Sequence, residues 1–157
     1  MRIVVLLLSI FVIAFKSKAQ KSDLEVATHE FEYVGDSLKL KKIVKILQSD
    51  SIDVIAKNIE ICELKIIDVG TTKTMKFSVY HIEYGPGVSC RGSYRTVFFN
   101  GESFVGYYVS DIAPPDKIDG DQLIWDFERN NPLFMDLSKE IPNHFLFGEF
   151  KRELYKN

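Results

Sequence analysis

From Asn58 to Ser110, hydrophobic residues recur at about every second position, and this alternation constrains the fold more than any other feature of the sequence. A period of two is typical of β-strands, because successive side chains of a strand point to opposite faces of a sheet. Turn-forming residues interrupt the alternation at positions 70–73, 85–87 and 100–101. Short connections of this kind join antiparallel neighbours, so we expect an antiparallel meander.

Five segments have the composition and length of strands. The first one loses its alternation between Ile61 and Leu64, which indicates a bulge or burial on both faces. Asn100-Gly101 is the strongest hairpin signal, because both central residues of a type I′ turn need a positive φ. Pro114 and Pro115 interrupt the ladder before the last strand. The expected strands are Ile59–Val69, Thr74–Tyr84, Tyr94–Phe99, Phe104–Ser110 and Gln122–Phe127.

One helix is expected before these strands. Asp36 and Ser37 are both favourable N-cap residues. The apolar residues that follow are spaced by three and four positions, as on one face of a helix, and lysines lie mostly on the other side. We interpret the lysines as a solvated surface rather than a ligand site. The apolar face consists of Leu40, Ile43, Val44 and Leu47.

Other segments give weaker signals. Gln20–Gly35 is expected to be a leader or a short edge strand, and Ile52–Lys57 a further helical turn or a connector. Leu133–Lys139 is expected to form a helical turn. Residues 143–156 form a helix or a last strand, and the pattern of Phe145–Phe150 favours the strand.

These elements predict an α+β fold in which the N-terminal helix packs on a four- to five-stranded antiparallel meander sheet. A chain of 157 residues is expected to form one domain. We assign residues 20–157 to this single α+β domain and residues 1–19 to a secretory signal peptide.

The amino terminus has the three parts of a signal peptide. Arg2 supplies a positive charge, Ile3–Phe15 is almost entirely apolar, and small residues stand at Ser17 and Ala19. Cleavage is therefore expected between Ala19 and Gln20, and the protein is expected to be secreted or periplasmic. The alternative is a retained anchor, but the apolar run is shorter than the ~20 residues that span a bilayer. We expect no stable membrane insertion after cleavage.

Charge excludes one class of partner. The full chain has a net charge of -2, and loss of residues 1–19 would leave about −5. Nucleic-acid binders present a clustered basic face, so we expect no nucleic-acid partner. The partner is expected to be an unknown protein or small ligand.

The two cysteines, Cys62 and Cys90, are expected to form a disulfide, because paired cysteines in an exported chain are usually oxidised. The competing interpretation is a catalytic thiol, which would need a basic partner and a local signature that the sequence lacks.

Metal and catalytic signals are weak. The acids between Asp111 and Glu128 fail the spacing of a calcium loop, and turn chemistry explains them better. His29, His81 and His144 have no metal-ligand spacing. We therefore expect no metal and no cofactor. An alternative function uses His81 with Asp or Glu partners in a small secreted hydrolase.

Two features favour binding. Gly85 and Gly87, followed by Arg91 and Arg95, could hold a phosphate or carboxylate, although a flexible hairpin connection is the simpler interpretation. Tyrosines on the strands would give an open sheet face suited to protein or carbohydrate recognition, unless the phenylalanine-rich C-terminal segment covers them.

We therefore expect a small exported binding module that recognises a protein, a carbohydrate or a small ligand, rather than an enzyme. An inhibitor- or immunity-like role fits its size and compartment. Its candidate contact residues are Tyr80, Tyr84, Arg91, Tyr94, Arg95 and Tyr108.

Overall fold

A computed structural model describes residues 30–49, 52, 54–55, 61–86, 91–110, 113–126 and 132–156. The predicted signal peptide, residues 1–19, lies outside the described residues. The elements are β1 (Glu30–Val34), α2 (Ser37–Leu47), β2 (Ile61–Thr71), β3 (Phe77–Pro86), β4 (Ser93–Asn100), β5 (Ser103–Ser110), β6 (Lys117–Asp119), β7 (Gln122–Trp125), β8 (Leu133–Asp136), β9 (His144–Phe147), β10 (Phe150–Glu153) and β11 (Tyr155–Lys156).

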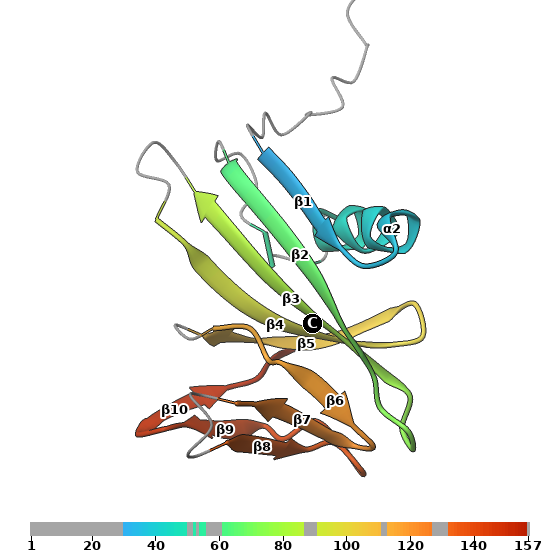
Figure 1. Cartoon of the computed structure of the whole chain (residues 1–157), viewed down its shortest axis with the longest axis vertical. Helices are drawn as coiled ribbons and strands as arrows, with labels where there is room; N and C mark the ends of the chain where they lie inside the picture. Colours follow the sequence, from blue (N-terminus) through green and yellow to red (C-terminus); the bar gives the residue numbers. More distant parts are fainter. Residues whose placement is uncertain are drawn as a thin grey trace, which may run out of the picture.

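Six strands form one mixed sheet in the order β1-β2-β3-β4-β5-β11. Strands β2 to β5 and β11 are antiparallel neighbours, whereas β1 runs parallel to β2. A parallel pair needs a crossover connection, and α2 lies in the connection between β1 and β2. Figure 1 shows α2 beside β1 and β2, with two smaller sheets below β4 and β5. These small sheets are β6-β7-β8 and the pair β9-β10.

The predicted α+β class, an N-terminal helix on a four- to five-stranded meander, is therefore wrong. The described chain is mostly β, with one short helix, and the helix follows a strand. The main sheet has six strands and is mixed, and two further sheets complete the fold. Sequence periodicity identified the local elements but could not show that β1 pairs in parallel with a strand far along the chain.

The helix itself is confirmed. The Asp36 side chain caps its N-terminus, because Oδ1 accepts hydrogen bonds from the backbone N–H groups of Leu38 at 3.0 Å and Lys39 at 3.2 Å. The predicted apolar face is buried: it consists of Leu40, Ile43, Val44 and Leu47.

Two hydrophobic cores lie on opposite faces of the main sheet. The first joins the apolar face of α2 to alternate residues of β2, β3 and β4, such as Ile66, Ile82 and Val97. The second joins the other face to the small sheets, with Phe98 and Trp125 among its members. The alternation predicted for β3 is confirmed, because Val79 belongs to the second core and Ile82 to the first.

Two local predictions need correction. The β4–β5 turn consists of Gly101 and Glu102, and only Gly101 has a positive φ, of 61°, whereas Asn100 pairs with Ser103. The segment expected to be a helical turn contains strand β8, which pairs with β7. Residues 143–156 form strands, as the pattern favoured, and Gly148, with a φ of 62°, lies in the turn between β9 and β10.

Candidate functional site

A groove with a volume of about 530 Å³ lies between α2 and the main sheet. The helix side presents residues from one face, since positions three or four apart lie above one another. The sheet side is formed by β3 and by the β4–β5 turn. We call this cavity the α2 groove; its lining is Asp36, Leu38, Lys39, Lys42, Ile43, Lys45, Ile46, Ser78, Tyr80, Gly101 and Glu102.

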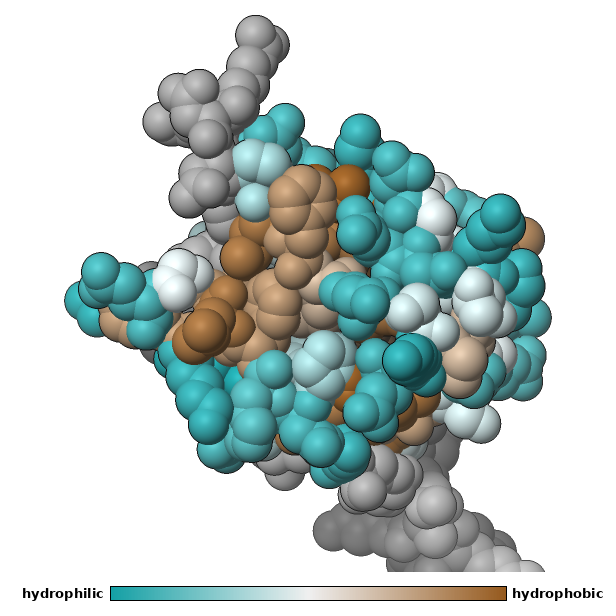
Figure 2. All heavy atoms as spheres, turned by 90° about the horizontal axis from the view of Figure 1, so that it is seen from below, coloured by the Kyte–Doolittle hydropathy of each residue, from teal (hydrophilic) through white to brown (hydrophobic). Residues whose placement is uncertain are grey.

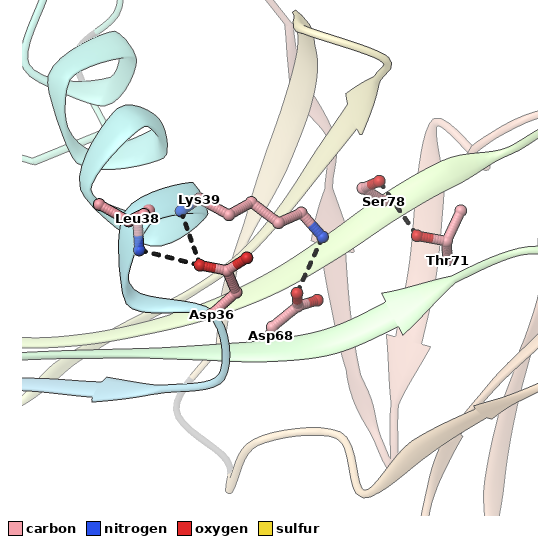
Figure 3. A network of polar contacts seen from close by, with 6 residues as sticks. All are labelled: Asp36, Leu38, Lys39, Asp68, Thr71 and Ser78. Carbon is pink, nitrogen blue, oxygen red and sulfur yellow. Dashed lines mark hydrogen bonds and ion pairs between the residues drawn. The ribbon is translucent and has the colours of Figure 1, made fainter.

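Lys39 crosses from the helix to the sheet within this groove. Its Nζ lies 2.8 Å from Oδ2 of Asp68 on β2 (Figure 3). The same Nζ lies 5.3 Å from the ring centroid of Tyr80. Burial alone would lower the pKa of Lys39, but its contacts with Asp68 and Tyr80 outweigh burial and raise that pKa above its ordinary value. Lys39 is therefore a positioned cation that fixes α2 against the sheet.

Lys42 and Lys45 have a different environment. Both side chains are exposed at the rim of the groove, and neither has a carboxylate partner among the described residues. The helix sequence SLKLKKIVKIL contains no acidic residue, so nothing within α2 neutralises these charges. The acids at the groove are Asp36, whose carboxylate caps the helix, and Glu102 in the turn.

The structure brings the predicted residues Arg95 and Tyr84 together. The Arg95 Nη2 donates to the Tyr84 hydroxyl at 3.1 Å, and the guanidinium carbon lies 5.4 Å from the Tyr84 ring centroid. Nη1 donates to Ser93 Oγ at 2.6 Å and to the Tyr94 carbonyl oxygen at 3.0 Å. Three of the five donors of this guanidinium thus hold neighbouring residues of the sheet. These contacts hold the guanidinium against β3 and β4.

Three of the four predicted contact tyrosines do not form an open face, and the fourth, Tyr94, is half-buried. Tyr80 and Tyr84 point into the first core and Tyr108 into the second, and all three are buried. The phenylalanine-rich segment covers Tyr108, whose ring packs against Phe145 and Phe147. The Tyr108 hydroxyl donates to the carbonyl oxygen of Pro142, and burial raises the Tyr108 pKa. The alternative prediction, that the C-terminal segment covers the tyrosines, is therefore confirmed for Tyr108.

His81, the residue proposed for a hydrolase, is fully buried. Its Nδ1 lies 3.4 Å from Thr96 Oγ1, and its Nε2 lies 3.8 Å from a Glu83 carboxylate oxygen and has no hydrogen-bond partner. The Tyr94 ring stacks on the imidazole with centroids 6.0 Å apart. Burial lowers the His81 pKa from 6.5 to about 4. A substrate has no path to this imidazole in the described structure, so the geometry does not favour hydrolysis.

Several other predicted features have a structural explanation or fall outside the described residues. Asp121 accepts hydrogen bonds from the Thr74 N–H and Oγ1, both at 2.7 Å, so it joins two turns. Within the described ranges, no three His, Cys, Asp or Glu side chains lie close enough to hold a metal ion. Arg91 is exposed. Cys90 lies outside the described residues, so its disulfide with Cys62 stays a prediction.

A second exposed surface lies at the end of the molecule formed by the small sheets. Figure 2, which views the molecule from this end, shows hydrophobic side chains gathered between polar ones. The exposed residues Phe134, Leu146 and Phe150 belong to β8, β9 and β10. These residues form an apolar surface, and Figure 1 shows that the strands carrying it lie far from α2.

Lys42 and Lys45 are exposed, as the predicted solvated surface requires, but the sequence did not show that they border a groove together with Leu38. One signal was present, because an exposed leucine stands on the lysine side of a helix that has no acids. Comparison with known proteins gave no further guide: no protein-family model, no curated protein and no solved structure matches this chain. No helix in the described part has the length and apolar character that a membrane crossing needs.

Proposed function

We propose that the protein is a small exported binding module whose ligand site is the α2 groove. The single observation that supports this proposal most is the combination of a mostly apolar lining with a fixed cation. The volume of about 530 Å³ falls within the range of small-molecule sites, about 300–1,000 Å³. Such sites combine an apolar wall with a few positioned polar groups, and Lys39 is held in place by Asp68.

The lining supplies contact area and charge. Ile43, Ile46 and the exposed Leu38 present apolar surface from the helix, and Tyr80 forms the floor on the sheet side. None of the described lining residues is a histidine or a cysteine. These features favour recognition over covalent chemistry. Export of the module rests on the predicted signal peptide, residues 1–19.

A neutral fluorescent probe tests the site. N-phenyl-1-naphthylamine becomes bright in apolar surroundings, so titration of the purified protein should show saturable binding of one probe per chain. The variants Leu38→Glu and Ile46→Glu place a charge in the apolar lining and should weaken binding by about ten-fold or more. Leu38 is 72% exposed, so its replacement leaves the core intact.

Leu146→Glu is the matched control, because Leu146 is 57% exposed on the distant apolar surface. It should bind the probe like the unchanged protein. The proposal fails if the unchanged protein binds no probe, or if Leu146→Glu loses as much binding as Leu38→Glu. Circular dichroism of each variant confirms that the fold is kept.

A further inference from the structure

We infer that the α2 groove takes an amphipathic anion: one carboxylate, sulfate or phosphate group joined to a single acyl or aryl chain. This inference rests on the proposed function and names the ligand class of the same site. It concerns the two lysines at the rim, which are separate from the paired Lys39.

The first argument is the arrangement of charge on the helix. Lys42 and Lys45 are three positions apart, so their side chains project from neighbouring positions on one face of α2. Like charges at this spacing repel and destabilise a helix slightly. Neither forms an ion pair with a described carboxylate, whereas Lys39 pairs with Asp68. A bound anion would remove the repulsion and satisfy both ammonium groups.

The second argument is the contrast with the rest of the chain. The whole sequence has a net charge of -2, yet α2 carries four lysines and no acid. Positive charge is therefore concentrated on the one helix that borders the groove, where it would attract an anion to the rim. Two carboxylates, those of Asp36 and Glu102, also line the groove and oppose part of this charge, and the Asp36 carboxylate accepts the hydrogen bonds that cap the helix.

The third argument is the apolar surface next to these lysines. Leu38 lies four positions before Lys42 and Ile46 four positions after it, so both apolar side chains are neighbours of Lys42 on the helix surface. A chain lying along this face would cover Leu38, which is otherwise 72% exposed. Inorganic phosphate alone would leave these apolar side chains uncovered. The proposed ligand therefore has both an anionic group and an apolar chain.

Displacement of the neutral probe N-phenyl-1-naphthylamine tests this inference. The Kd of decanoate, measured by displacement of the probe, should be at least about ten-fold lower than that of decanol, and added salt should reduce this difference. The double variant Lys42→Gln/Lys45→Gln should bind decanoate about ten-fold more weakly and bind decanol with unchanged affinity. Lys41→Gln is the matched control, because Lys41 is exposed on α2 but does not line the groove. Decyl phosphate in place of decanoate distinguishes a phosphate preference from a carboxylate preference, and either one supports the inference.

Other outcomes overturn it. If decanol binds as tightly as decanoate while the probe still binds, the ligand class is wrong and the proposed function stands. If inorganic phosphate displaces the probe as well as decanoate does, the chain is not recognised. If the molar mass rises with protein concentration, and Leu38→Glu abolishes that rise, a second copy occupies the groove. If the probe itself does not bind, the proposed function fails first.

Discussion

The Lys39 ammonium lies 2.8 Å from Oδ2 of Asp68, and this ion pair joins α2 to β2 at the base of the groove (Figure 3). The Asp68 side chain is 18% exposed, and its second oxygen, Oδ1, is buried without a hydrogen-bond partner. Loss of the lysine would therefore leave a carboxylate with little compensation. The pair therefore adds a polar link between α2 and β2 to the apolar packing of Leu40 and Leu47 in the first core.

We predict that Lys39→Met lowers the free energy of unfolding by about 1–2 kcal/mol, because it leaves the partly buried Asp68 carboxylate unpaired. Urea denaturation measures this change. The exposed Lys41→Met is the control, with an expected change within about 0.5 kcal/mol. Addition of Asp68→Asn to Lys39→Met should recover part of the loss. Equal stability of the two single variants would show that the ion pair contributes nothing.

The buried His81 predicts a dependence of stability on pH. Its pKa is about 4 in the folded protein because burial disfavours the charged imidazole, compared with 6.5 in a model peptide. Between these values the unfolded chain binds a proton that the folded chain does not, so stability falls as the pH is lowered from 6.5 to 4. The His81 contribution should amount to about 3 kcal/mol across this interval.

The measurement compares slopes. Urea unfolding gives the free energy of unfolding of the unchanged protein and of His81→Gln at each pH from 7 to 4. This free energy should depend less steeply on pH in the variant, whatever its absolute stability. Leu146→Gln, a change of an exposed side chain that does not titrate, should keep the original slope. If His81→Gln keeps the slope as well, other groups cause the acid sensitivity.

The local elements of the fold could be predicted because short-range patterns determine them. The cap at Asp36 and the spacing from Leu40 to Leu47 define α2 within twelve residues. The pairing of β1 with β2 could not be predicted in the same way. In this pairing Tyr33 lies opposite Ile66, and the periodicity within a segment does not show which strand becomes its neighbour.

The site was harder to predict than the fold. On the helix alone, Lys42 and Lys45 look like ordinary solvated lysines, and a groove exists only because the β4–β5 turn brings Gly101 and Glu102 opposite α2. The prediction that tyrosines form an exposed contact face failed for a similar reason. Alternation showed that Tyr84 and Tyr108 lie on strands, but the layers that cover each face come from distant segments.

A pair of neighbouring residues tests the packing of the small sheets. Phe147 is 4% exposed, and its ring centroid lies 5.2 Å from that of Trp125 and 4.9 Å from that of Phe145, whereas the adjacent Leu146 points outward. We predict that Phe147→Ala lowers the free energy of unfolding by about 3–5 kcal/mol through the cavity it leaves. Leu146→Ala should change it by less than about 0.5 kcal/mol. Urea unfolding followed by Trp125 fluorescence measures both, and similar losses would contradict the packing described.

The predicted disulfide can be tested independently of the groove. Cys62 lies on β2 with its sulfur 3.1 Å from the Gly85 carbonyl oxygen, near the end of β3 and five positions before Cys90 in the sequence. A bond between the two sulfurs would close a loop of 29 residues, so Cys62→Ser/Cys90→Ser should lower stability by about 3–4 kcal/mol. Thiol titration of the denatured, exported protein should find no free thiol. The same double variant compared with the reduced protein is the control, since both should unfold at similar urea concentrations. Two titratable thiols in the exported protein would contradict the prediction and would also weaken the inference of an oxidising compartment, because paired cysteines persist as disulfides there.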